Sequence, residues 1–238
     1  MKQILGAFPF AKERLAIISG GRTLSAVYVS AGDEAPVVLI CHGIGEWVEY
    51  WGGVQGLLQR LGISSLLFNY SGYGTSSGTI STAHCEEDAA AAYQRLVDMG
   101  HQSIVLLGFS LGTGVVCAVA PWVDVAGVIL CEGFSTLRDA GIAMGFPRWL
   151  ARAVPDAWNT VHCIGELGLP VLVVHSEDDR LFPLSMARQV FEACGSCGEL
   201  VVMRGFSHDS PIYSPTEEYW EPIAAWVKQR ALTEKVQR

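Results

Sequence analysis

The 238-residue sequence is poor in charged side chains, and positive charges are the scarcer kind. Charged residues make up 17% of the chain, and 16 lysines and arginines stand against 24 aspartates and glutamates, which gives a net charge of -8. The positive residues are scattered rather than gathered in a stripe, which argues against a nucleic acid or an anionic membrane surface as partner. A small neutral or apolar molecule fits this composition better.

The sequence also lacks a disulfide framework or a zinc-ligand pattern. Its seven cysteines are an odd number and several stand in apolar runs, which favours a reducing, cytoplasmic location over a secreted one. Cys194 and Cys197 form one C-x-x-C without the second pair or nearby histidine that a metal site needs. A redox role for this pair stays open, and we expect no metal or other cofactor.

Neither a leader peptide nor a membrane span is expected. The charged residues Lys12, Glu13 and Arg14 directly follow a short apolar run, and no good cleavage site appears. Residues 102–123 carry no charge and are long enough to cross a bilayer. Three glycines and a proline interrupt this segment, so that a buried strand followed by a buried helix explains it better.

Apolar residues make up half of the chain, and they recur in short runs separated by helix-length segments. Several runs are continuously apolar, as strands buried on both faces of a parallel sheet require. The alternation predicts one α/β domain over residues 1–238, with a mostly parallel eight-stranded sheet, helices on both faces and a ligand site beyond the carboxyl ends of the strands. The expected strands are 15–19, 24–29, 36–41, 64–70, 103–108, 125–131, 170–176 and 199–204, and the expected helices are 52–62, 81–99, 110–121, 184–194 and 215–232.

Two stretches fit the G-x-S-x-G pattern that surrounds the nucleophilic serine of many hydrolases: GTSSG at 74–78 and GFSLG at 108–112. A nucleophile turn requires a strand before the serine and a helix after it. The second stretch meets this requirement, whereas the first lies among glycines and hydroxyl residues that are typical of a loop. We therefore predict Ser110 as the nucleophile and interpret Ser76 as a turn residue.

A serine nucleophile needs a histidine base and a carboxylate that orients the base. After Ser110 the chain offers three consecutive acids, residues 177–179, behind a buried strand, and then His208 in a loop after the last expected strand. All of these groups would lie at the carboxyl ends of neighbouring strands. His208 is the predicted base, and one of the three acids is its predicted partner.

These motifs together resemble the α/β-hydrolase superfamily over nearly the whole chain. The resemblance is greatest to small-lid abhydrolase-domain proteins of the depalmitoylase type and their bacterial, aminopeptidase-like relatives. It implies an α/β-hydrolase fold and, through the family's H-G-x-x-D-x-x-V-P pattern, places the acid on Asp179, with Asp178 as the alternative. The motifs are CHGIG at 41–45, NYSGYGTSSG at 69–78, GFSLGTG at 108–114, HSEDDRLFP at 175–183 and GFSHD at 205–209.

The resemblance also implies an oxyanion hole made by the backbone N–H groups of Ile44 and Leu111. The side chain of His42 is expected to brace this loop rather than to transfer protons. Two departures stand against protein depalmitoylation: Ile44 and Gly45 replace the usual polar pair, and the cysteine-rich N-terminus of that group is missing.

The connection over residues 132–169 is too short for a large cap and is expected to form a small apolar lid. We predict Trp47, Phe146 and Trp149 as substrate-binding residues, against the alternative that these aromatics only pack in the protein. Glu46 and Glu132 are further acids near the expected site. Three interpretations of each stay open: a substrate contact, an alternative catalytic acid or an ordinary solvated side chain.

The combined prediction is a serine hydrolase that cleaves small carboxylic esters or thioesters with an apolar acyl or aryl group through an acyl-enzyme. A neutral His208 is required, so that activity should rise between about pH 6 and 8. Peptide or amide hydrolysis is the alternative within enzymes, and a non-catalytic ligand-binding homologue is the alternative outside them. A serine rather than an aspartate at 110 disfavours dehalogenase and epoxide hydrolase chemistry.

Overall fold

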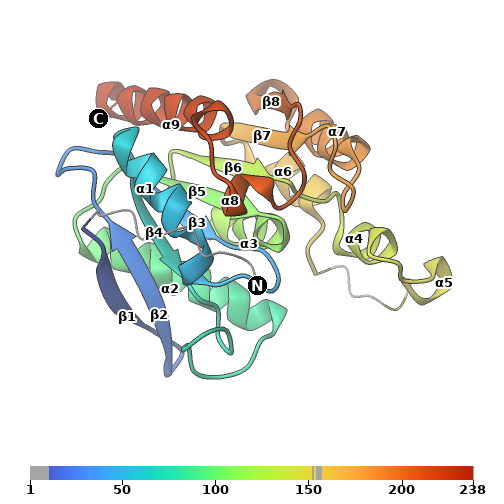
Figure 1. Cartoon of the computed structure of the whole chain (residues 1–238), viewed down its shortest axis with the longest axis horizontal. Helices are drawn as coiled ribbons and strands as arrows, with labels where there is room; N and C mark the ends of the chain where they lie inside the picture. The colour runs from blue at the N-terminus through green and yellow to red at the C-terminus, as the bar shows by residue number, and fades with distance from the viewer. Residues whose placement is uncertain (1–10, 152, 154–156, 238) are drawn as a thin grey trace.

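The computed structural model describes residues 11–151, 153 and 157–237. The N-terminal run considered above as a leader peptide lies largely outside this part of the chain. A single twisted sheet of eight strands forms its centre, with helices on both sides (Figure 1). The expected α/β-hydrolase fold, with a mostly parallel eight-stranded sheet, is confirmed.

The strands follow the spatial order β1-β2-β4-β3-β5-β6-β7-β8. Among the described strands, β2 alone runs antiparallel to both of its neighbours, and the strands from β4 to β8 pair in parallel. Each observed strand overlaps one of the runs expected from the sequence. The strands are β1 Glu13–Ser19, β2 Arg22–Val29, β3 Val37–Cys41, β4 Ser64–Phe68, β5 Ile104–Phe109, β6 Gly127–Cys131, β7 Val171–Ser176 and β8 Gly198–Met203.

The continuous apolar strands are explained by a separate core on each face of the sheet. In β3, Val37 and Leu39 belong to the core on one face, whereas Val38 and Ile40 belong to the core on the other face. All four side chains are fully buried. Burial of each such side chain contributes about 1.5–3 kcal/mol, so that both faces of the sheet contribute to its stability.

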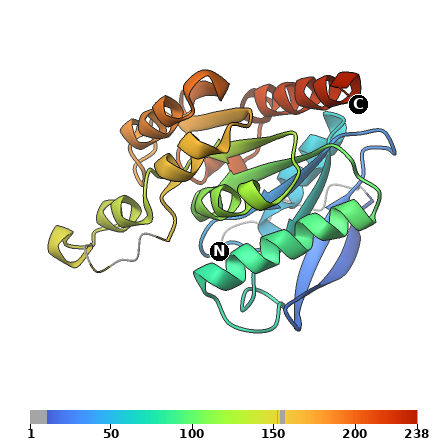
Figure 2. The same ribbon diagram turned by 180° about the vertical axis from the view of Figure 1, so that it is seen from behind.

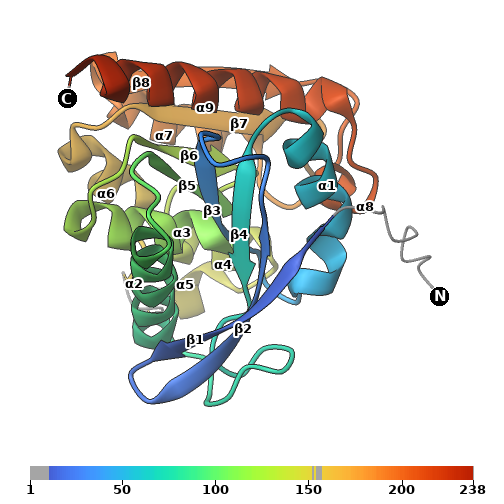
Figure 3. The same ribbon diagram turned by 90° about the vertical axis from the view of Figure 1, so that its left-hand side faces the viewer.

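Helices cover both faces, as Figure 3 shows with α1 on one side of the sheet and α2 and α3 on the other. Residues of α2, α3, α6 and α7 pack into one core, and residues of α1, α8 and α9 pack into the other. The helices are α1 Gly52–Arg60, α2 Thr82–Asp98, α3 Leu111–Val119, α4 Leu137–Ala143, α5 Arg148–Ala151, α6 Thr160–Leu167, α7 Leu184–Ala193, α8 Ser210–Tyr213 and α9 Glu217–Gln237, with 3₁₀ turns at Val48–Trp51, Ala120–Trp122 and Gly195–Cys197.

The uncharged segment 102–123 forms β5 and α3, as expected from its glycines and proline. Nearly all of its apolar side chains between Ile104 and Ala120 are buried inside the protein. Within the described residues, no helix combines the length and the apolar character needed to cross a bilayer.

The connection between β6 and β7 holds three helices that the sequence analysis did not predict. Helices α4 and α5 project away from the body of the protein, a feature visible in both Figure 1 and its reverse view, Figure 2. Helix α6 then returns and packs against α3 and α7. Large apolar side chains remain exposed on the projecting part, among them Met144, Phe146 and Trp149.

The turn between β5 and α3 depends on a close approach of backbones at Gly112. A Cβ atom at this position would overlap the carbonyl oxygen of Cys41 in β3. We therefore expect Gly112→Ala to lower the free energy of unfolding by about 2 kcal/mol or more, because the backbone cannot yield as a flexible side chain can. Urea denaturation measures this loss.

Gly165→Ala is the matched control for this prediction. Gly165 is exposed inside α6, and the nearest atom to a Cβ there would be the carbonyl oxygen of Ala193, at an ordinary contact distance of 3.6 Å. This variant should be more stable by up to about 1 kcal/mol, because alanine favours the helix. Equal stabilities of the two variants would contradict the packing account of Gly112.

Candidate active site

Ser110 lies at the tip of a sharp turn between β5 and α3, as its sequence context predicts. Its backbone has φ 52° and ψ -116°, in a region that residues with a side chain rarely adopt. A Cβ atom at Gly108 would overlap the backbone of Gly112. The glycines on either side of Ser110 therefore allow strand and helix to meet closely enough to present the hydroxyl at the sheet edge.

The side chain of Ser110 is the first member of a chain of hydrogen bonds. Its Oγ lies 3.0 Å from Nε2 of His208, and Nδ1 of His208 lies 2.7 Å from Oδ2 of Asp179. The three residues follow β5, β7 and β8, so that the carboxyl ends of these strands bring them to one edge. The geometry thus joins a hydroxyl, an imidazole and a carboxylate in the order that nucleophilic catalysis requires.

Asp179 is fixed by its own loop. Its Oδ1 accepts hydrogen bonds from the backbone N–H groups of Leu181, at 2.7 Å, and Phe182, at 3.0 Å. Burial raises the pKa of Asp179, but the bond to His208 and these N–H donors outweigh it and hold the pKa below its usual value. Asp178 and Glu177 are exposed, so that Asp179 is the acid of this loop that contacts His208.

His208 is partly buried between aromatic rings and beside carboxylates. Phe109 and Phe182 lie with ring centroids 5.6 and 5.3 Å from the imidazole. Burial lowers the pKa of His208, but the hydrogen bond and charge of Asp179 raise it, and the net pKa lies above the ordinary value of 6.5. Nδ1–H donates to the carboxylate, which leaves Nε2 as the acceptor for the Ser110 hydroxyl proton.

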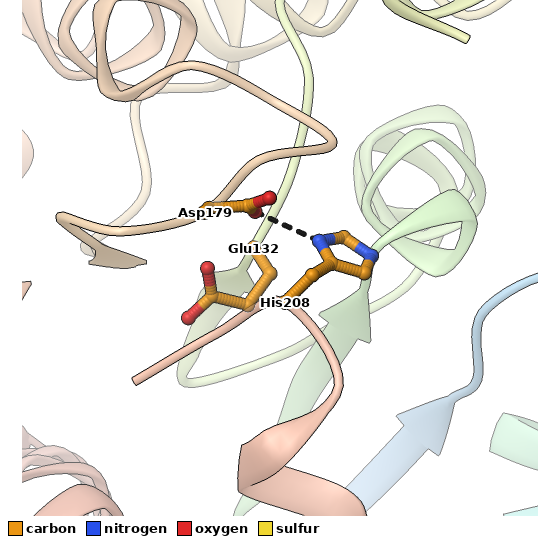
Figure 4. Close-up of side chains that lie close together, drawn as sticks. All are labelled: Glu132, Asp179 and His208. Atoms are coloured by element: carbon orange, nitrogen blue, oxygen red, sulfur yellow. Dashed lines mark hydrogen bonds and ion pairs between the residues drawn. The ribbon is translucent and has the colours of Figure 1, made fainter. Parts of the chain in front are cut away.

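A second buried carboxylate, that of Glu132, lies beside this pair (Figure 4). Glu132 directly follows β6, and its carboxylate accepts hydrogen bonds from the backbone N–H and the hydroxyl of Ser176 and from the hydroxyl of Tyr219, at 2.7–2.9 Å. Burial raises its pKa to about 7, against the lowering effect of these donors.

Glu132, Asp179 and His208 offer possible metal-ligand atoms within 4.8 Å of one another. Each of the four carboxylate oxygens already accepts a hydrogen bond from the protein, and Nδ1 of His208 is bonded to Asp179. The cluster is therefore explained by a hydrogen-bond network, and we assign no metal to it.

The loop expected to form the oxyanion hole passes close to Ser110. A Cβ atom at Gly43 would lie 3.1 Å from Cβ of Ser110. His42 is fully buried, its Nδ1–H donates to the carbonyl of Gly43 at 2.8 Å, and burial lowers its pKa to about 4. A neutral ring packed 4.5 Å from that of Tyr70 fits the expected bracing role.

Glu46 holds the same loop from the other side. Its Oε2 accepts hydrogen bonds from the N–H of Gly43 at 3.0 Å and from the indole N–H of Trp51 at 2.9 Å. Burial raises the pKa of Glu46 to about 7. A glutamate three residues after the glycine is the sequence signal for such a bond, because this spacing lets a side chain return to a backbone N–H.

The other predicted site residues lie in the surroundings of this network. Leu111 is the first residue of α3 and Ile44 is more than half exposed in the loop after Gly43. Donation from their N–H groups to an oxyanion stays a prediction. Trp47 stacks on Tyr50 at 5.1 Å between ring centroids.

A cavity of about 1060 Å³ opens beside the carboxylate–imidazole pair. It is lined by residues 177–181 and 205–209, which include Asp179 and His208. Trp47, Phe146 and Trp149 are not among its lining residues, and Phe146 and Trp149 lie on the projecting α4–α5 segment. The structure thus brings the three hydrogen-bonded residues together but leaves the predicted substrate contacts outside this cavity.

The competing motifs have structural explanations. Oγ of Ser76 accepts a hydrogen bond from the N–H of Ser25 at 2.9 Å and donates to the carbonyl of Asn69 at 2.8 Å, so that it fixes a loop. In the C-x-x-C pair, Cys194 is buried at the end of α7, and burial raises the pKa of its thiol to about 11. A thiol of this kind is a poor redox nucleophile.

Glu46 offers a test of how the loop is held. We expect Glu46→Ala to lower the free energy of unfolding by about 1–3 kcal/mol, because two buried N–H donors lose their acceptor. Urea denaturation measures the change, with Glu49→Ala, an exposed glutamate of the same segment, as the control. The assignment fails if both variants unfold at the same urea concentration.

The chain is similar to several known proteins. Residues 36–163 match the family described as alpha/beta hydrolase fold. An uncharacterized protein of Mycobacterium tuberculosis is 30% identical over 187 residues, which are 76% of this chain and 66% of that protein. Alpha/beta hydrolase domain-containing protein 17C of Mus musculus is 29% identical over 176 residues, 72% of this chain and 53% of that protein. The chain thus spans about half to two thirds of these relatives.

Solved structures agree in fold. The esterase Pf2001 of Pyrococcus furiosus superposes with a TM-score of 0.75 at 20% identity, over 92% of this chain and 90% of that chain. The thioesterase domain from the curacin biosynthetic pathway superposes with a TM-score of 0.69 at 18% identity, over 92% and 99%. Together with the match over more than half of its residues, this likeness leads to one conclusion: the chain belongs to the α/β-hydrolase fold family.

Proposed function

We propose that the protein is a serine hydrolase that cleaves carboxylic esters or thioesters bearing an apolar acyl or aryl group. The observation that carries this proposal is the hydrogen-bonded series Ser110, His208 and Asp179 at the tip of a strained turn. The esterase and thioesterase structures with the same fold are consistent with it.

In the first step, Nε2 of His208 takes the hydroxyl proton of Ser110 while Oγ attacks the carbonyl carbon of the substrate. Collapse of the tetrahedral intermediate breaks the bond to the alcohol or thiol, which leaves with the proton held by His208. Water then attacks the acyl-enzyme in the same way and releases the acid and a free Ser110. Asp179 holds the ring orientation and stabilises the imidazolium in both steps.

The N–H groups of Ile44 and Leu111 would stabilise the oxyanion of each tetrahedral intermediate. One such donor contributes roughly 10²–10³-fold to kcat in serine hydrolases. The bonds that hold Gly43 to Glu46 and to His42 support this role, because they fix the loop from both sides. The loop is therefore set before the substrate arrives.

We further propose that the chain over 1–238 acts as one catalytic domain and that residues 132–169 serve as a short lid. The exposed aromatic side chains Phe146 and Trp149 on this segment, together with Trp47, support contact with an apolar part of the substrate. A cytoplasmic location is proposed as well, because no disulfide joins cysteines in the described part of the chain.

Labelling with a fluorophosphonate probe tests the nucleophile. We expect the wild-type protein to be labelled and Ser110→Ala to remain unlabelled, because the probe reacts with an activated serine hydroxyl. Ser76→Ala, which alters the other G-x-S-x-G stretch, is the matched control and should label like wild type. Unlabelled wild type, or equal labelling of Ser110→Ala, would refute the assignment.

A further inference from the structure

Glu132 shares an unusual backbone conformation with Ser110. Among the described residues other than glycine, these two alone have positive φ angles, 49° for Glu132 and 52° for Ser110. Such a conformation is strained for a residue with a side chain and persists where the surrounding structure fixes it. The turn at Ser110 presents a nucleophile, whereas the steps of the proposed reaction give Glu132 no task.

The environment of the Glu132 carboxylate is closed, and no lysine or arginine in the described part of the chain forms an ion pair with it. The side chain is fully buried, and its three donors are one backbone N–H and two hydroxyls. Burying a carboxylate in this way is costly compared with an apolar side chain.

The charged and titratable groups around Glu132 come from every element that packs against it. Asp179 and His208 lie in the loops after β7 and β8, within 4.8 Å between ligand atoms. Cys131 of β6 and Tyr219 of α9 have their pKa raised by burial, so that both stay neutral.

The fifth group is His175 of β7. Its Nδ1 lies 3.9 Å from Oε2 of Glu132 and has no hydrogen-bond partner, and its Nε2–H donates to the carbonyl of Phe182 at 2.9 Å. Burial lowers the pKa of His175, so that its ring is neutral. His208 is then the group in this cluster on which a positive charge can form. The carboxylates that interact with it are those of Asp179, Glu132 and Asp209, the residue after His208, and that of Glu46.

We infer that Glu132 is a positioning residue for the reaction, whose buried carboxylate, in its ionised form, stabilises the protonated form of His208 alongside Asp179. The inference rests on the proposed function, in which His208 becomes an imidazolium in each tetrahedral intermediate. Glu132 acts through His208, and its hydrogen bonds go to Ser176 and Tyr219 rather than to Ser110. The charge of Glu132 is among the causes that raise the pKa of His208.

Removing the charge of Glu132 should change the pH dependence of activity in one direction. A nearby anion favours the protonated imidazole, so that removing it lowers the pKa of His208. Glu132→Gln should therefore shift the rise of activity to lower pH, while kcat at the plateau falls about threefold, the factor that corresponds to half a pKa unit, and KM stays nearly unchanged. In the wild type the midpoint of the rise should lie above pH 6.5, since the pKa of His208 is raised. A merely structural role would lower the active fraction without moving the midpoint.

An NMR titration of the His208 ring in a Ser110→Ala background tests the inference without requiring activity. Glu132→Gln should lower the titration midpoint of His208 by about half a pH unit or more. Glu166→Gln, an exposed carboxylate on α6, should leave the midpoint unchanged. Equal midpoints for the two variants would overturn the inference.

Ser176→Ala covers the case in which Glu132→Gln does not fold. It removes one hydroxyl donor from the carboxylate, which raises the pKa of Glu132 and should move the His208 midpoint in the same direction by a smaller amount. An unchanged midpoint in this variant would also count against the inference. A failure of the proposed function would be seen in a different measurement. In that case the fluorophosphonate probe would not label the wild-type protein, whatever the titration midpoint of His208.

Discussion

The pair of hydrogen bonds on the imidazole of His208 is the constraint on which the arrangement of the site depends. Nδ1–H reaches Asp179 at 2.7 Å and Nε2 faces Ser110 at 3.0 Å, so that one ring fixes the distance between loops from three strands. Both bonds require the parallel order of β5, β6, β7 and β8, which places the ends of these strands side by side. The glycines around Ser110 are needed for the same reason, because only a tight turn brings the hydroxyl to the ring.

Burial makes the charges around this ring effective. Asp179, Glu132 and Glu46 are almost inaccessible to water, and each is satisfied by donors from the backbone or from neutral side chains. In such surroundings the charge of a carboxylate acts on a neighbouring imidazole more strongly than it would in water. Asp179 stays ionised because His208 and the N–H groups of its own loop donate to it, whereas Glu46 and Glu132, with pKa values raised to about 7, change charge near neutral pH.

Much of the fold could be predicted from local patterns. Runs such as 36–41 are apolar at every position, which only a strand buried on both faces explains, and β3 has this environment. Helices α4, α5, α6 and α8 were missed because they are short and their positions depend on distant contacts. One such contact is the packing of Trp158 against Gly114 of α3, which no pattern near residue 158 reveals.

The convergence of the three hydrogen-bonded residues could be predicted, because the order of the strands alone determines it. Ser110, Asp179 and His208 each follow a strand of the parallel part of the sheet, so that their convergence follows from the strand order. The surroundings were not predictable in this way, since Glu132 is held by Tyr219, 87 residues away, and no spacing announces such a bond. The aromatic residues predicted to bind substrate were chosen by residue type. Residue type does not show where a projecting segment lies relative to the cavity.

The most direct test of the account is mass spectrometry of the protein after brief incubation with an activated acyl ester at low pH, followed by proteolysis. The account predicts a covalent acyl group on the peptide that contains Ser110, since the good leaving group of an activated ester makes acylation faster than release by water, and low pH slows that release further. Two results would contradict the account. One is hydrolysis of the ester with no acylated peptide in either wild type or Asp179→Asn, and the other is an acyl group on a residue other than Ser110.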